Sequence, residues 1–237
     1  MKTLLLAIPT YNEALVIETN LRKAHSLLSD LLKDFGWTLL VADNGSTDET
    51  SAIVERLKGE LPRLALWHTD KKGRGNALRH VWQEFDADVY AYMDADLATD
   101  LSELPKLLRE LEHADLAIGS RLSMTSHTDR SFFREVVSRG YNILSRVLVG
   151  TKIKDLQCGF KAIKADVAKQ ILPLCTHDGW FFDTELIVLA EHHGFKVAEL
   201  PVTWHEAPDR RRKSSVKVFQ TAWDDFVNLL RLKRRLH

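Results

Sequence analysis

The stretch Val89–Tyr90–Ala91–Tyr92–Met93 runs directly into Asp94–Ala95–Asp96. A short apolar run of this kind is typical of a strand that is buried on both faces of a sheet. Such a strand delivers two carboxylates to its own carboxyl end. Two aspartates separated by one residue are suited to bind Mg²⁺ or Mn²⁺, because hard cations prefer carboxylate oxygens and keep positions open for substrate phosphates. Taken alone, the motif is equally compatible with a solvated acidic turn.

Apolar runs of similar length recur along the chain and alternate with helical patterns. The expected strands are Leu4–Ile8, Thr38–Ala42, Leu64–His68, Val89–Met93, Leu116–Ile118 and Lys196–Leu200. The expected helices are Glu13–Lys33, Asp48–Lys58, Gly75–Glu84 and Ser102–Leu111. This alternation predicts an α/β fold with a mostly parallel central sheet and helices on both faces. Ligands of such sheets bind beyond the carboxyl ends of the strands, so the loops after the first, second, fourth and fifth strands should converge.

Composition limits the function and the compartment. Lys and Arg total 33, as do Asp and Glu, so the overall charge gives no indication of nucleic-acid binding. Cys158 and Cys175 form neither a metal-ligand spacing nor a disulfide framework, which favours a cytoplasmic location. Because no apolar run has the length of a membrane span, membrane contact is expected to be peripheral, on the inner face.

Two of the expected loops carry groups suited to a nucleotide. Pro9–Glu13 presents an aromatic ring that can stack on a nucleobase. In the same loop, Asn12 is expected to cap the following helix, and Glu13 favours the positive end of its dipole. The second loop, Asp43–Asp48, leaves Asp43 at a strand end as a free carboxylate that can accept base N–H groups.

Basic residues occur in several segments that could meet phosphate. The glycine-containing loop Lys71–Ala77 precedes a helix and suits diphosphate oxygens, although a solvated basic loop is the commoner explanation. Arg121 follows a strand, where a guanidinium is a natural partner for phosphate. Arg134 and Arg139 form a second basic group. The run Arg210–Lys213, followed by Lys217, reads either as a solvated linker or as a loop that closes over a ligand.

Four motifs follow one another in order, each at an expected strand end: Pro9–Glu13, Asp43–Asp48, Asp94–Asp96 and Gly119–Arg121. Together they resemble the family 2 glycosyltransferases of GT-A fold, whose central sheet is Rossmann-like. The segments Asp155–Lys161 and Trp180–Glu185 resemble those of dolichyl-phosphate mannose and glucose synthases. The resemblance therefore covers almost the whole chain.

That family implies transfer of a hexose from a UDP- or GDP-linked sugar to a polyprenyl phosphate, with inversion at the anomeric carbon. It also implies Mg²⁺ or Mn²⁺ on the leaving diphosphate, with Asp96 as direct ligand and Asp94 beside it. Asp94, Asp96 and Arg121 form the implied catalytic group, and Arg121 and Arg134 would face the acceptor phosphate. The implied contacts of the nucleotide sugar are Pro9, Tyr11, Glu13, Val41, Asp43, Asp94, Ala95, Asp96, Arg211 and Lys217.

The chain departs from that pattern at two places. Mannose synthases usually place Gln shortly after the paired aspartates as a further metal ligand, whereas this chain has Ala98, as is more typical of the glucose-synthase branch. In the basic loop, Arg211 and Lys217 have the separation expected for donor-phosphate contacts, but Ser214–Val216 leaves their register open by about two residues. We assign 1–209 to the catalytic domain and 210–237 to this loop and an appended amphipathic helix.

Three further questions stay open at this level. The amphipathic segments Glu135–Val149 and Phe219–Leu236 suit contact with a membrane surface or a membrane-embedded partner, or simple packing on the domain. The acceptor could instead be a saccharide or another hydroxyl compound, which would require a general base such as Asp183 or Glu185. A module that binds nucleotide sugars without turnover is a third alternative.

Overall fold

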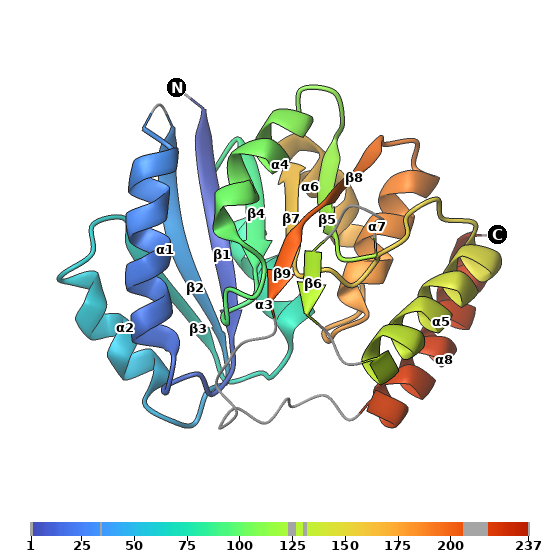
Figure 1. Cartoon of the computed structure of the whole chain (residues 1–237), viewed down its shortest axis with the longest axis horizontal. Coiled ribbons are helices and arrows are strands. Elements are labelled where there is room, and N and C mark those ends of the chain that lie inside the picture. The colour runs from blue at the N-terminus through green and yellow to red at the C-terminus, as the bar shows by residue number, and fades with distance from the viewer. Residues whose placement is uncertain (1, 34, 123–126, 130–131, 206–217, 237) are drawn as a thin grey trace.

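The fold is organised around one mixed sheet, seen in a computed structural model that describes residues 2–33, 35–122, 127–129, 132–205 and 218–236 (Figure 1). The sheet has seven strands in the order β3-β2-β1-β4-β7-β5-β8. Their bounds are β1 Thr3–Thr10, β2 Gly36–Asn44, β3 Leu64–Thr69, β4 Val89–Met93, β5 Leu116–Ser120, β7 Phe160–Lys164 and β8 Val197–Pro201. Every strand expected from the sequence is present; Val89–Met93 has the expected bounds, and the others differ by one or two residues at one or both ends.

The mostly parallel sheet is confirmed. β1 pairs in parallel with β2 and β4, β2 with β3, and β5 with β8. The exception is β7, which the sequence patterns did not reveal and which lies antiparallel between β4 and β5. Met93 at the end of β4 is paired with Phe160 at the start of β7. The residues just before β7 therefore lie beside the paired aspartates that follow β4.

Helices cover both faces of the sheet, as predicted (Figure 1). One core contains side chains from α1 Ile17–Leu31, α2 Thr50–Lys58 and α4 Leu104–Glu110, the last preceded by a 3₁₀ turn at Leu101–Glu103. The other contains α3 Arg74–Glu84, α6 Ala165–Ile171 and α7 Phe182–His192, with a second 3₁₀ turn at Leu172–Leu174. Along β1, Leu4, Leu6 and Ile8 enter the first core and Leu5 and Ala7 the second, because alternate side chains point to opposite faces.

Two long helices, α5 Phe132–Val149 and α8 Val218–Leu236, lie side by side at one end of the molecule (Figure 1). Leu229 and Leu232 of α8 are buried in the same core as α7. At the end of α8, Arg235 Nη1 lies 2.5 Å from Glu185 Oε1, which anchors that end of the helix to α7. Among the residues described, no helix combines the length and apolar character needed to span a bilayer.

A short second sheet pairs β6 His127–Asp129 with β9 Thr203–His205 in parallel. Beyond that pairing, β9 also contacts the loop after β4. The Asp100 N–H donates to Thr203 O at 3.1 Å, and the His205 N–H donates to Ala98 O at 2.8 Å. These bonds hold the loop that carries the paired aspartates. The proposed boundary between 209 and 210 lies outside the described residues.

The first helix begins later than expected. Glu13 O accepts the N–H groups of Val16 and Ile17 in a turn, and α1 starts only at Ile17. Asn12 has a positive φ of 56° and does not cap the helix. Its Oδ1 instead accepts the Thr47 N–H at 2.7 Å, which fastens the first loop to the second. The expected capping role of Asn12 is therefore wrong, because a contact between loops takes the place of the local one.

Candidate active site

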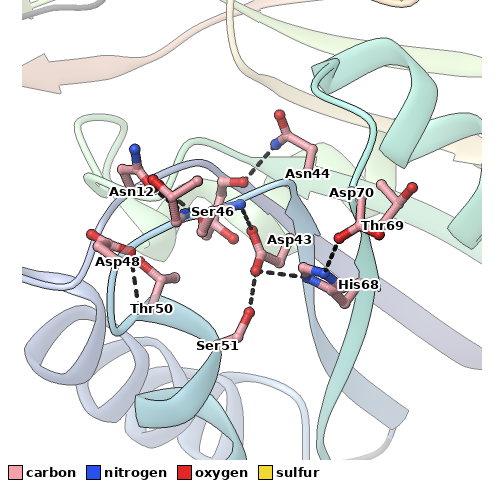
Figure 2. A network of polar contacts seen from close by, with 12 residues as sticks. Asn12, Asp43, Asn44, Ser46, Asp48, Thr50, Ser51, His68, Thr69 and Asp70 are labelled. Carbon is pink, nitrogen blue, oxygen red and sulfur yellow. Dashed lines mark hydrogen bonds and ion pairs between the residues drawn. The ribbon is translucent and has the colours of Figure 1, made fainter.

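The loops after β1, β2 and β3 are joined by side-chain hydrogen bonds (Figure 2). The first two of these loops were expected to converge, whereas the loop after β3 was not among those expected. Asn12 accepts from the Thr47 N–H, and Asn44 Nδ2 donates to Thr10 O at 2.6 Å. Asn44 Oδ1 in turn accepts the Gly73 N–H at 3.2 Å. Two asparagines thus connect three loops, and they do so mainly through backbone groups that any sequence would present.

Asp43 is the centre of this network and is fully buried. Its carboxylate accepts the Ser46 N–H at 3.1 Å and the His68 Nδ1–H at 3.0 Å, and it contacts the Ser51 hydroxyl (Figure 2). The hydrogen bond to Asp43 raises the pKa of His68. The expectation of a free carboxylate is wrong, because long-range partners from β3 and α2 occupy it. A nucleobase contact by Asp43 remains a prediction.

The other residues implied for the nucleotide differ in accessibility. Pro9 and Tyr11 are partly exposed at the end of β1, whereas Glu13 is buried and Val41 lies entirely within the core. Lys72 Nζ lies 3.7 Å from the centroid of the Tyr11 ring. That ammonium covers one face of the ring and contributes a cation–π attraction. The Tyr11 ring therefore already has the Lys72 ammonium against one face. Val41 supports the site by packing in the core.

The paired aspartates follow β4 as predicted, with Ala95 buried between them. The Asp94 side chain is 36% exposed, and Asp96 Oδ1 accepts the Ala98 N–H at 3.2 Å. Burial raises the pKa of Asp94, as does Asp96 to a smaller degree, whereas the charges of Arg74 and Arg121 oppose that rise. Two carboxylates in one loop thus share a region where fixed cations are close.

Gly159, the residue before β7, makes room for the Asp94 carboxylate. The Asp94 N–H donates to Gly159 O at 3.2 Å, so the two residues are in backbone contact. A Cβ on Gly159 would collide with Oδ1 and Oδ2 of Asp94. Glycine is therefore required here for close approach rather than for a special backbone conformation. The sequence contained this glycine, but only the β4–β7 pairing shows what it faces.

Arg121 makes a two-point ion pair that was not foreseen. Its Nε and Nη2 each lie 2.8 Å from the Asp155 carboxylate, and its backbone N–H donates to Asp155 at 2.9 Å. The Asp155 side chain is fully buried, and that of Arg121 is 11% exposed. Burial alone would raise the pKa of Asp155, but the Arg121 guanidinium outweighs it and the pKa is lowered. The implied contact of Arg121 with an acceptor phosphate remains a prediction.

Behind the aspartates lies a buried cluster of charged groups. Lys161 Nζ is 2.8 Å from Asp183 Oδ1 and 3.0 Å from Tyr92 Oη, and the Tyr92 hydroxyl also contacts Asp183. Burial lowers the pKa of Lys161 to about 7 and raises that of Asp183 to about 7. Arg74 Nη2 lies between Asp94 Oδ1 at 3.1 Å and Asp183 Oδ2 at 3.6 Å. Neither cation was singled out from the sequence. Arg74 was considered only as part of the basic loop Lys71–Ala77, and Lys161 lies within the mostly apolar strand β7.

Neither candidate general base is available to a substrate. Asp183 is 1% exposed and is already engaged by Lys161 and Tyr92. Glu185 is also 1% exposed and accepts the N–H groups of Thr176 and His177, each at 2.9 Å. Both carboxylates therefore maintain the structure around α7 rather than face an open site.

Three residues of the expected site cannot be placed. Arg211 and Lys217 lie outside the described residues. Arg134 belongs to α5, but the structure describes only its backbone. Their implied contacts with the donor and the acceptor remain predictions.

The residues present fit a hard divalent cation that is shared with a ligand. Within the described parts of the chain, no group of three or more His, Cys, Asp or Glu side chains is arranged to hold a metal. Asp94 and Asp96 together offer two carboxylates at a strand end. Mg²⁺ commonly binds through one or two carboxylates and completes its coordination with water and substrate phosphates. The donor set therefore suits a cation that binds together with a diphosphate better than one held by protein alone.

Comparison with known proteins identifies the family. The sequence model of glycosyl transferase family 2 matches residues 6–172, which include strands β2 to β7, the second part of β1 and both aspartates. The chain belongs to glycosyl transferase family 2. The match covers well over half of the chain, and it confirms the resemblance that the four strand-end motifs indicated.

Curated relatives have similar sequences over most of this chain. Glycosyltransferase AglD of Haloferax volcanii is 37% identical over 86% of the chain, which spans 33% of AglD. Dolichyl-phosphate beta-glucosyltransferase of Saccharomyces cerevisiae is 29% identical over 92% of the chain and 71% of the relative. Dolichol-phosphate mannosyltransferase of Pyrococcus furiosus is 28% identical over 83% of the chain and 55% of the relative. The chain thus spans only part of each relative.

The same fold is also found among solved structures. Glucosyl-3-phosphoglycerate synthase from Mycobacterium tuberculosis, in complex with Mn²⁺, UDP and phosphoglyceric acid, superposes with a TM-score of 0.73. The alignment covers 98% of this chain and 78% of that one, at 19% identity. This likeness confirms the fold alone.

Replacing Gly159 should damage the arrangement of the two aspartates. We expect Gly159→Ala to weaken Mn²⁺ binding by about 10- to 100-fold, as is usual when groups that orient metal ligands are disturbed. Electron paramagnetic resonance of free Mn²⁺ measures this affinity. Gly140→Ala is the matched control, because nothing lies within 4 Å of a Cβ at Gly140. Equal affinities in the two variants would contradict the proposed role of Gly159.

Replacing Arg121 should destabilise the protein in a pH-dependent way. Arg121→Ala leaves the buried Asp155 without its cation, and breaking such a pair costs about 3–5 kcal/mol. Because the pKa of Asp155 is lowered on folding, the stabilisation is present above the ordinary Asp value near ~3.9 and is lost as the pH falls through the folded value. Urea unfolding of wild type and variant at pH 7 and pH 3 measures the difference.

The control for this measurement is a cation at the surface. Arg22 pairs with Glu18 and Glu60 while 42% exposed, so Arg22→Ala should lower the stability far less than Arg121→Ala does, because solvent screens an exposed pair. If Arg121→Ala costs no more than Arg22→Ala at pH 7, the Arg121–Asp155 pair is not the stabilising contact inferred here.

Proposed function

We propose that this chain transfers a hexose from a UDP- or GDP-linked sugar to a polyprenyl phosphate, with inversion at the anomeric carbon. The observation that carries the proposal is the contact of Asp94, the first of the paired aspartates, with the buried guanidinium of Arg74, at the edge where the strand-end loops converge. The named activities of the yeast and Pyrococcus relatives, dolichyl-phosphate glucosyl and dolichol-phosphate mannosyl transfer, support it.

The reaction suits a site that supplies positive charge rather than a base. A phosphate monoester has its second pKa near ~6, so the acceptor is mostly a dianion at neutral pH and needs no deprotonation. One of its oxygens would bond to the anomeric carbon as the bond from that carbon to the diphosphate breaks, and the electron pair leaves with the nucleoside diphosphate. Bringing two anions together is the main electrostatic difficulty, and cations fixed in a partly dry site reduce it.

Individual residues have distinct proposed roles. Asp94 and Asp96 would hold Mg²⁺ or Mn²⁺, which when bound supplies charge to stabilise the leaving diphosphate. Tyr11 would stack on the base, and Arg121 would attract the acceptor phosphate. Pro9, Glu13, Asp43, Ala95, Arg211 and Lys217 are the other proposed donor contacts, with Val41 packing behind them and Arg134 on the acceptor side.

A hydroxyl acceptor receives no support from the geometry. Such an acceptor needs a base within hydrogen-bond reach of its proton. The two candidates, Asp183 and Glu185, are each 1% exposed and engaged within the protein. The presence of both metal-type aspartates likewise favours turnover over mere binding.

Removing one aspartate charge tests the proposed reaction. Transfer from radiolabelled UDP- and GDP-sugars to a short polyprenyl phosphate, with Mg²⁺ or Mn²⁺, is scored as label in the organic phase. We expect label with wild type and a loss of at least about 100-fold with Asp96→Asn, because a direct ligand is removed. Asp100→Asn is the control, since the Asp100 side chain is exposed and, among the contacts described, accepts only the nearby Ser102 N–H.

Two results would contradict this assignment. Wild-type rates in Asp96→Asn at saturating metal would remove Asp96 from the reaction. Metal-dependent binding of the nucleotide sugar by wild type, without lipid product, would point to another acceptor.

We also propose that α5 and α8 contact the membrane surface where a polyprenyl phosphate resides. Both helices expose large apolar side chains: Ile143 at 54% and Val147 at 75% on α5, with Trp223 at 66% and Leu230 at 37% on α8. The exposed cations Arg231 and Arg234 lie on the same helix as Trp223. Apolar and basic side chains together are typical of helices that lie on anionic lipid, and an exposed tryptophan suits the interface.

Vesicle sedimentation tests the membrane contact. We expect wild type to pellet with vesicles containing anionic phospholipid. Trp223→Ala should partition about tenfold more weakly, because it loses a large apolar side chain that would be buried in the lipid. Leu15→Ala is the control, because Leu15 is 77% exposed but lies outside both helices. Equal partitioning of the two variants would exclude α8 as the membrane contact. If wild type stays in solution, the proposed membrane contact of both helices is excluded.

A further inference from the structure

Arg74 is a buried cation with hydrogen-bonding capacity that the described protein does not use. We propose that Arg74 binds the diphosphate of the donor directly and is the fixed cation of that subsite. The identity of the ligand rests on the proposed function, whereas the unused capacity of Arg74 is a property of the structure. The argument starts from how the chain places the guanidinium.

Arg74 is the first residue of α3 and is 7% exposed. The helix can approach α7 closely because Gly75 follows. A Cβ on Gly75 would collide with Phe182 Cβ and with His177 O. This close packing directs Arg74 inward, where its Nη2 lies 3.1 Å from Asp94 Oδ1. A guanidinium thus lies directly beside the carboxylate proposed to hold the metal.

Two aromatic rings border the guanidinium. The Arg74 Cζ is 4.9 Å from the centroid of Tyr92 and 4.7 Å from that of Trp180. Tyr92 is fully buried, whereas Trp180 is 44% exposed. Cation–π contacts of this kind restrict the position of the side chain. Arg74 is therefore held in place between a buried ring and a ring that borders solvent.

The guanidinium retains unused donors despite this confinement. Its Nε and Nη2 are buried and make no hydrogen bond, because the 3.1 Å approach to Asp94 lacks hydrogen-bond geometry. An unsatisfied buried donor is costly, and more so when the group is charged. Donors of this kind on a planar fork suit the oxygens of a phosphate group. The cost is explained if a ligand completes the hydrogen bonds.

A purely structural role explains the position of Arg74 less well. Asp183 already has Lys161 Nζ at 2.8 Å, nearer than Arg74 Nη2 at 3.6 Å, so it does not need a second cation. A positive side chain in the first turn of a helix is also opposed by the helix dipole. The same dipole and the same guanidinium both attract an anion placed at that end.

Isothermal titration calorimetry of UDP and GDP in saturating Mn²⁺ tests the proposal. We expect Arg74→Gln to bind the better diphosphate at least tenfold more weakly than wild type, and Arg74→Lys to recover part of the loss by restoring the charge without the fork. The deficit should be larger for the diphosphate than for the matching monophosphate. Arg79→Gln is the control, since Arg79 is on the same helix but pairs with Asp178 instead.

Each outcome has a defined meaning. Wild type that binds neither diphosphate overturns the proposed function together with this inference. Wild type that binds, with unchanged affinity in Arg74→Gln, overturns the inference alone. Equal losses for diphosphate and monophosphate, or equal losses in Arg74→Gln and Arg79→Gln, would mean that the helix is disturbed and would also overturn it.

Two further measurements test whether each variant is folded and whether Arg74 binds the acceptor phosphate instead of the donor diphosphate. Thermal unfolding establishes that each variant is folded, and if Arg74→Gln does not fold, Arg74→Lys is compared with wild type. We expect a severalfold weaker diphosphate affinity for that variant, and an unchanged affinity would overturn the proposal. Binding of a short polyprenyl phosphate should be unaltered by Arg74→Gln. A loss confined to that ligand would assign Arg74 to the acceptor.

Discussion

The pairing of β4 with the antiparallel strand β7 is the constraint on which the candidate site depends. It brings Gly159 against Asp94, so that the carboxylate occupies space that a side chain would otherwise fill. It also places Lys161 beside Tyr92, in the layer that supports the aspartates from behind. A strand that enters the sheet in the opposite direction can deliver its first residues to the carboxyl edge, where the parallel strands end. The ligand edge of the sheet is therefore built from both directions.

Charge is fixed around this edge before any ligand binds. Arg121 is neutralised by Asp155, and Lys161 by Asp183, in buried pairs with short contacts. Arg74 lies between two carboxylates but forms no hydrogen bond through its Nε or Nη2. Buried pairs contribute little net stability, yet breaking one is expensive, so they hold polar groups in defined positions. A site of this kind needs little reorganisation when negative charge develops during a reaction.

Sequence patterns succeeded where local chemistry decides the structure. The strand Val89–Met93 has the expected bounds, because its apolar residues alternate between the two cores of a doubly covered sheet. The first helix was expected too early, and Asn12 was expected to cap it. Both errors arose because a hydrogen bond to the Thr47 N–H, across 35 residues, competes with the local cap. Asp43 was expected to be free for the same reason, since His68 comes from another strand.

The sequence by itself determined the α/β class, the order of the strand-end motifs, the paired aspartates and membership of family 2, because these depend on hydrophobic period and on motif spacing. Only the tertiary structure decided which charges meet. Arg121 with Asp155, Lys161 with Asp183, and Arg74 with Asp94 are joined across 34, 22 and 20 positions of the sequence, respectively. Charged side chains carry no periodic signal of their partners, and their pairing follows from strand order and burial, where an unpaired charge is too costly to remain.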